Sequence, residues 1–173
     1  MPGEIIIYTD GASSGNPGPG GYGVVLISGK HRLEKSEGFK LTTNNRMELM
    51  AVIAGLEALK IPGSKVIIYT DSKYVADSVE KGWVFQWESK GFKKKKYVDL
   101  WIELDKILSA NFHSISFKHS KDVKYSPDFQ LADQLSKTMT GKRNLPTDLK
   151  TVDKNGVELF GATGDEQTPN GTL

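Results

Sequence analysis

The sequence contains no cysteine, which excludes disulfide bridges, thiolate metal ligands and cysteine nucleophiles. It also has no apolar run near the ~20 residues that a membrane-spanning helix requires. Its first residues lack the basic and apolar segments of a secretion signal. We therefore expect a cytoplasmic protein without membrane contact. The net charge at pH 7 is only +2, and a value so close to zero indicates no class of partner.

The chain has 173 residues, of which 38% are hydrophobic, and this is enough for one folded domain with an appendage. Residues 144–173 hold two basic and five acidic residues, a net charge of −3, so the rest of the chain carries +5. Much of that excess lies at 90–96, where five of seven residues are lysine and aromatic residues lie close by. We expect a catalytic domain over 1–143 and a polar, acidic tail over 144–173 that is loosely ordered or docked.

Strand-like and helix-like segments alternate along the domain. β-Branched and alternating patterns predict strands over residues 4–10, 22–28, 32–39, 65–71 and 113–119, with a glycine-rich loop over 11–21. Helical spacing predicts helices over residues 45–60, 72–81, 98–108 and 126–140. This order predicts an α/β fold in which a five-stranded mixed β-sheet is flanked by α-helices.

Two of the predicted strands end in the same phrase, Tyr-Thr-Asp, at Asp10 and at Asp71. Functional groups gather at the carboxyl edge of sheets with helical crossovers, and neighbouring strands would hold both carboxylates side by side. The structural alternative is that each aspartate only begins a turn or a helix, as Asp71 could do before Ser72.

Two further carboxylates fall on predicted helices. Glu48 lies near the start of one helix, where Asn45 and Glu48 also have the spacing of a capping box. Asp133 lies inside the last helix, in the register of the apolar Phe129 and Leu135, and an acid bordering a buried face usually has a partner. Four clustered carboxylates would repel one another unless a cation such as Mg²⁺ or Mn²⁺ bound them. Spacing alone leaves their convergence open.

Several long phrases of the sequence carry a family resemblance. They lie at residues 8–12 (YTDGA), 15–23, 42–51 (TTNNRMELMA), 70–75 (TDSKYV), 98–101 and 132–135. Together they resemble type 1 ribonuclease H over residues 4 to 140, and the tail lies outside the resemblance.

The resemblance implies a ribonuclease H-like fold and a monomeric endonuclease that hydrolyses the RNA strand of RNA–DNA hybrids. It implies products with 5′-phosphate and 3′-hydroxyl ends. The family's metal ligands correspond to Asp10, Glu48, Asp71 and Asp133. Two Mg²⁺ ions roughly 4 Å apart, or Mn²⁺ as a substitute, would activate the attacking water and stabilise the leaving 3′ oxygen.

Substrate-contacting positions are implied in the same way. They are Gly11, Asn16, Thr43, Asn44, Asn45 and Ser72, together with Lys93, Lys94, Lys95 and Lys96 in the segment that matches the family's basic protrusion. Amide and hydroxyl groups can contact 2′-hydroxyls, which distinguish RNA from DNA. The lysines would bind phosphate, and the alternative is a solvated charged loop.

The sequence departs from the family near its last aspartate. The family usually has a histidine ten residues before that aspartate and an asparagine four before it, where this chain has Val123 and Phe129. His119 lies fourteen residues before the aspartate. Either an insertion lets His119 serve as the catalytic histidine, or the role is lost, and Lys121 or Lys124 is a candidate substitute. His119 could equally be a strand-end residue that only packs or forms hydrogen bonds.

Two other functions remain compatible with the residues. The altered histidine loop would suit a module of the same fold that binds hybrid or double-stranded RNA without cutting it. An integrase- or transposase-like nuclease is the third reading, and the asparagine-rich phrase at 43–45 favours RNA contacts over it.

Overall fold

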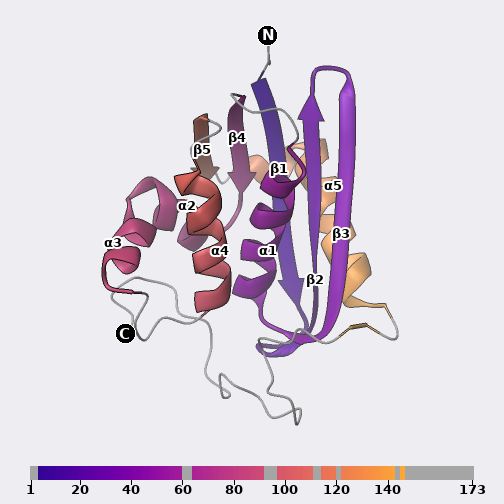
Figure 1. The fold of residues 1–173 in the computed structure, drawn as a ribbon. Helices are drawn as coiled ribbons and strands as arrows, with labels where there is room; N and C mark the ends of the chain where they lie inside the picture. The colour runs from indigo at the N-terminus through magenta and orange to yellow at the C-terminus, as the bar shows by residue number, and fades with distance from the viewer. Residues whose placement is uncertain are drawn as a thin grey trace.

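A computed structural model describes residues 4–59, 64–91, 97–110, 114–119, 122–142 and 145–146 of the chain. The described part contains a five-stranded mixed sheet in the order β3-β2-β1-β4-β5, which confirms the predicted α/β fold (Figure 1). The strands are β1 (Glu4–Ser13), β2 (Gly18–Ser28), β3 (His31–Thr42), β4 (Lys65–Thr70) and β5 (Ser114–His119). The helices are α1 (Asn44–Glu57), α2 (Lys73–Glu80), α3 (Trp83–Ser89), α4 (Val98–Ser109) and α5 (Pro127–Thr140), with a 3₁₀ turn η1 (Val123–Tyr125).

Strand β1 is the central element that positions the site. It pairs antiparallel with β2 along nearly its whole length and parallel with β4 only as far as Thr9, which faces Thr70. Because pairing with β2 continues to Ser13, the glycine-rich loop predicted over 11–21 is shorter than expected. At the other end of β2, a two-residue turn follows Ser28, and Gly29 has the positive φ of 60° that such hairpins favour.

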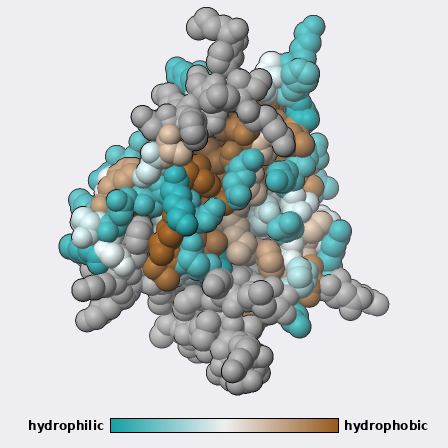
Figure 2. Space-filling model, viewed as in Figure 1, coloured by the Kyte–Doolittle hydropathy of each residue, from teal (hydrophilic) through white to brown (hydrophobic). Residues whose placement is uncertain are grey.

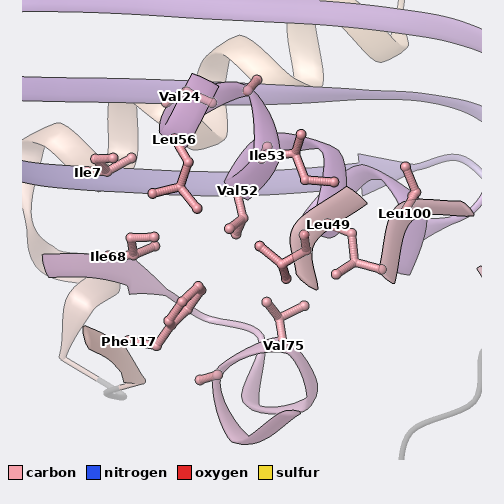
Figure 3. Packing of buried hydrophobic residues seen from close by; sticks show 14 of the residues in the cluster. Ile7, Val24, Leu49, Val52, Ile53, Leu56, Ile68, Val75, Leu100 and Phe117 are labelled. Atoms are coloured by element: carbon pink, nitrogen blue, oxygen red, sulfur yellow. The ribbon is translucent and has the colours of Figure 1, made fainter. Parts of the chain in front are cut away.

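The core lies between the sheet and the helices on one of its faces. Helix α1 supplies Leu49, Val52 and Leu56, which pack against Ile7 and Ile68 of the central strands (Figure 3). Hydrophilic residues cover much of the outer surface of this face, with apolar residues visible between them (Figure 2). None of the described helices combines the length and the apolar character needed to cross a membrane.

Helix α1 begins at Asn44 and is capped by Thr43, whose hydroxyl accepts a hydrogen bond from the Arg46 N–H at 3.2 Å. The structural alternative, in which Asn45 and Glu48 form a capping box, is therefore excluded, because Thr43 is the cap. Thr43 precedes the first helical residue and has extended backbone angles, which place its hydroxyl over the free N–H groups of the first turn.

Helix α3 was not predicted. It contains only seven residues and follows Gly82, which has a positive φ of 74°. A segment of seven residues is too short to show the repeated helical spacing on which the other helices were recognised. Trp87 from this helix packs edge-to-face on Trp101 of α4, with ring centroids 5.0 Å apart.

Helix α5 covers the opposite face of the sheet and approaches it unusually closely. It lies on a glycine track formed by Gly21 and Gly23 of β2 and Gly38 of β3. A Cβ atom on Gly23 would overlap the carbonyl oxygen of Ala132, and one on Gly21 would lie 2.9 Å from that of Ser136. Only glycine permits this backbone-to-backbone approach, and the approach sets how deeply the residues of α5 reach toward β1.

We expect Gly23→Ala to lower the free energy of unfolding by about 2 kcal/mol, since the added methyl group must push α5 away from β2. Denaturant unfolding at neutral pH would measure this loss. Gly29→Ala is the matched control for the loss of a glycine in the same hairpin, because a Cβ there meets no atom within 4 Å and its cost comes from φ alone. Equal losses in the two variants would contradict the close approach.

On each edge strand of the sheet, one backbone N–H donates a hydrogen bond to a residue that lies outside the sheet. On β5, the Phe117 N–H donates to Oε1 of Glu80 from α2 at 2.7 Å. On β3, the Lys40 N–H donates to the carbonyl oxygen of Pro146 at 2.9 Å. Pro146 is one of two described residues of the predicted tail, and the remainder of that prediction lies outside the described residues.

Candidate active site

Asp10 and Asp71 lie next to each other where the pairing of β1 with β4 ends, as the repeated phrase predicted. Thr9 and Thr70 are register partners on parallel strands, so the residue that follows each one comes to the same place. Asp10 is buried, with 3% of its surface exposed, whereas Asp71 is exposed. The site therefore combines one buried and one exposed aspartate.

Glu48 completes a three-carboxylate group with these two aspartates. One carboxylate oxygen from each of the three residues lies within 4.8 Å of the others. Gly11 makes this possible, because a Cβ there would overlap the backbone nitrogen of Glu48 and hold α1 away from β1. Glu48 Oε2 is buried and accepts no hydrogen bond from any residue that the structure describes. A buried acceptor without a donor beside two further carboxylates fits a cation-binding site.

Asp133 joins the group from α5. Its carboxylate is hydrogen-bonded to the Asp10 side chain and forms an ion pair with Lys137 Nζ at 2.9 Å. It lines the same pocket as the other three acids but is not part of the tight three-residue group. The four carboxylates, whose convergence the spacing left open, all line one pocket, and Asp133 lies outside the group of three.

A pocket of about 420 Å³ opens over these acids. Of the predicted substrate-contacting residues, four line it: Gly11, Asn44, Asn45 and Ser72. Sequence reasoning missed four other lining residues: Ala12, Lys73, Tyr74 and Lys137. Helical spacing could have found Lys137, which lies four residues after Asp133.

Asn16 and Thr43 do not line the pocket and act as helix caps in this structure. Asn16 Oδ1 accepts hydrogen bonds from the Asn44 N–H and the Ser13 hydroxyl, both at 2.9 Å. These contacts, with the Thr43 cap, hold the first turn of α1 against the end of β1. Contact of either side chain with substrate stays a prediction, and the predicted lysine contacts at 93–96 lie outside the described residues.

The carboxylates strongly perturb one another. Burial raises the pKa of Asp10 to about 8, with added contributions from its hydrogen bond to Asp133 and the charge of Asp71. Burial also raises the pKa of Glu48 well above its usual value, as do the charges of Asp10 and Asp71. For Asp133, burial is outweighed by hydrogen bonds to Asp10 and Lys137, which lower its pKa. Without a cation the site therefore retains protons at neutral pH.

The metal-free protein should lose stability as the pH rises from about 4 to about 8. Over this range the folded state keeps the proton of Asp10, whose pKa is raised from 3.8 to about 8, while the unfolded state releases it. The free energy of unfolding should therefore fall by roughly a few kcal/mol over this pH range. Urea unfolding with a chelator at pH 5 and pH 8 would measure the change. A flat or rising profile in the wild-type chain would contradict the buried, proton-retaining Asp10.

His119 is the last residue of β5 and pairs with Thr70, the residue before Asp71. Burial raises the pKa of Asp71, and the charge of His119 partly offsets that rise. His119 is exposed and does not line the pocket. Val123 and Phe129, which occupy the family's histidine and asparagine positions, are buried at 6% and 4% exposure. Lys121 lies outside the described residues, and Lys124 Nζ lies 5.3 Å from the centre of the Tyr125 ring.

The family profile described as RNase H matches residues 2–140, which span every residue of this pocket. The chain belongs to the ribonuclease H family. The resemblance to type 1 ribonuclease H is therefore confirmed, together with the predicted enzyme class.

Relatives and solved structures agree with this membership. The ribonuclease H of Trichodesmium erythraeum is 49% identical over 151 residues, covering 84% of this chain and 94% of the relative. That of Desulforamulus reducens is 47% identical over 152 residues, covering 85% of this chain and 94% of the relative. The crystal structure of LC11-RNase H1 in complex with an RNA/DNA hybrid is 28% identical, with a TM-score of 0.59 over 78% of this chain and 94% of that one.

Proposed function

We propose that this chain is an endonuclease that hydrolyses the RNA strand of RNA–DNA hybrids with divalent cations bound by Asp10, Glu48, Asp71 and Asp133. The observation that carries the proposal is the group of three carboxylates within 4.8 Å of one another, at the base of a pocket in a ribonuclease H fold. We further propose products with 5′-phosphate and 3′-hydroxyl ends.

The donor set favours a hard cation. The ligands are carboxylate oxygens alone, which suit Mg²⁺, with Mn²⁺ as a substitute. We propose two ions, which when bound would activate the attacking water and stabilise charge on the leaving 3′ oxygen. The chain's own part is to hold the carboxylates in place: Gly11 lets α1 bring Glu48 close, and the strand register aligns Asp10 with Asp71.

Other pocket residues are suited to bind the hybrid. The side chains of Asn44 and Asn45 are at the start of α1, where amide groups can read 2′-hydroxyls and base edges. Lys73 and Lys137 also line the pocket and add positive charge beside the acids, which favours a phosphate backbone. We propose that the lysines at 93–96 extend this phosphate contact, so that binding weakens as salt rises.

The alternatives make different predictions in one experiment. Purified protein would be incubated with labelled RNA–DNA hybrid, duplex DNA and duplex RNA, each with Mg²⁺ and with a chelator. We expect cleavage of the hybrid alone, only with Mg²⁺, with 5′-phosphate on the RNA products. Binding without product would support the non-cleaving module, and cleavage of duplex DNA would support the integrase-like reading.

We propose that His119 assists the reaction from the rim of the site, because it ends the strand next to the one that carries Asp71. His119→Ala should slow turnover several-fold while calorimetry shows unchanged Mg²⁺ binding. His31→Ala is the matched control, since His31 is exposed at the far end of β3. An unchanged rate for His119→Ala between pH 6 and 9 would show that the residue is structural.

We also propose that residues 1–143 form the catalytic domain and that the protein acts as a monomer in the cytoplasm. All of the pocket-lining residues lie between positions 10 and 137 of one chain, so the site needs no second copy.

A further inference from the structure

A serine on α5 contacts the most buried aspartate of the site. Ser136 has none of its surface exposed, and its hydroxyl lies 3.2 Å from Oδ2 of Asp10 and 2.8 Å from the backbone oxygen of Asp133. The hydroxyl thus joins the strand that carries one carboxylate to the helix that carries another.

We propose that Ser136 is a positioning residue, whose hydroxyl holds Oδ2 of Asp10 and so orients that carboxylate toward the divalent cations. The inference rests on the proposed function, because it requires Asp10 to bind metal. A carboxylate can turn about its Cβ–Cγ bond, and a donor held in a fixed place restrains that rotation. Residues that orient metal ligands in this way commonly change metal affinity when they are replaced.

The glycine track gives the contact its fixed geometry. The carbonyl oxygen of Ser136 lies 2.9 Å from where a Cβ of Gly21 would be, so the helix backbone at this residue rests directly on β2. Strand β1, which carries Asp10, is the next strand in the sheet and pairs with β2 at Gly23. A side chain at Gly21 or Gly23 would push α5 away from β2 and so move the serine away from Asp10.

A serine inside a helix can also donate a hydrogen bond to a backbone carbonyl of the preceding turn, which is a second role for Ser136 besides its contact with Asp10. The hydroxyl has one proton to donate, which the carbonyl of Asp133 and the carboxylate of Asp10 share. Thr140 shows the backbone role alone, since its hydroxyl donates to the carbonyl oxygen of Ser136 at 2.8 Å one turn later. Thr140 is therefore the matched control on the same helix.

The test compares the full-length wild-type chain with Ser136→Ala, Ser136→Cys and Thr140→Ala. Cysteine nearly keeps the size of serine and is a weak donor, so it separates packing from hydrogen bonding. Calorimetric titration with Mg²⁺ alone should show about tenfold weaker binding in both Ser136 variants. The Mg²⁺ concentration for half-maximal cleavage should rise by a similar factor, with the KM for hybrid at saturating Mg²⁺ unchanged. Thr140→Ala should match the wild type.

Unchanged Mg²⁺ affinity in Ser136→Ala would overturn the inference and leave the proposed function intact. Wild-type affinity in Ser136→Cys alone would overturn it as well, because the serine would then serve only to fill space. If the wild-type chain itself binds no Mg²⁺, the proposed function fails first, and the inference fails with it.

Discussion

Asp10→Asn should reduce Mg²⁺-dependent cleavage of an RNA–DNA hybrid by about 1,000-fold or more. Bound cations supply several kcal/mol of transition-state stabilisation, and each 1.36 kcal/mol is a factor of ten in rate. The amide cannot replace the charge of the carboxylate that lies between Glu48, Asp71 and Asp133. Single-turnover cleavage at saturating Mg²⁺ would measure the loss.

The same variant should keep most of its affinity for hybrid, because the proposed substrate contacts are made by other residues, among them Asn44 and Asn45 of the pocket. Asp128→Asn is a matched control: it removes an aspartate from the first turn of α5 that pairs with Arg32 at 2.6 Å, outside the pocket. Its cleavage rate should equal that of the wild type. Full activity in Asp10→Asn would refute the metal-site assignment.

The second large effect is expected at a buried ion pair between α1 and α4. Arg46 is fully buried, and its two terminal nitrogens donate to the two oxygens of Asp99 at 2.9 and 3.0 Å. Asp99→Asn would remove the negative charge that accepts two hydrogen bonds from this buried guanidinium. We expect the free energy of unfolding to fall by about 3 kcal/mol, as measured by urea unfolding at pH 7.

Glu4→Gln provides the comparison for an ion pair in solvent. Glu4 lies 3.5 Å from Lys65, and both side chains are largely exposed, so its loss should change stability by less than about 0.5 kcal/mol. A similar small change in Asp99→Asn would mean that the pair contributes little to holding the two helices together. Arg46 also lies three residues after Thr43, so the pair helps to hold the capped end of α1 beside the acids.

The sequence could predict those parts of the site that depend only on the order of residues along each strand. Asp10 and Asp71 each follow an apolar run of residues, and parallel pairing of β1 with β4 brings the two aspartates together. Glu48 and Asp133 needed tertiary information, because their place depends on how closely two helices approach the sheet. That approach is set by Gly11 and by the glycine track.

Residues that only position other residues leave no recognisable pattern in the sequence. A buried serine such as Ser136 looks like any helical serine until its contact with Asp10 is known. The spacing of Asn45 and Glu48 fitted a capping box, but the helix is capped by Thr43, whose extended backbone angles only the structure reveals. The family's histidine position is occupied by Val123, whose side chain is buried.

The occupied donors at the two edges of the sheet bear on how the protein behaves at high concentration. An open edge strand offers unpaired N–H groups as a template on which another chain can add, and this is a common start of aggregation. Here the carboxylate of Glu80 and the carbonyl of Pro146 each occupy such a donor. Charged residues also follow the outer part of β3, at Arg32, Glu34 and Lys35. An intruding strand would have to displace these groups before it could pair, which favours a chain that stays dispersed while it searches for hybrid.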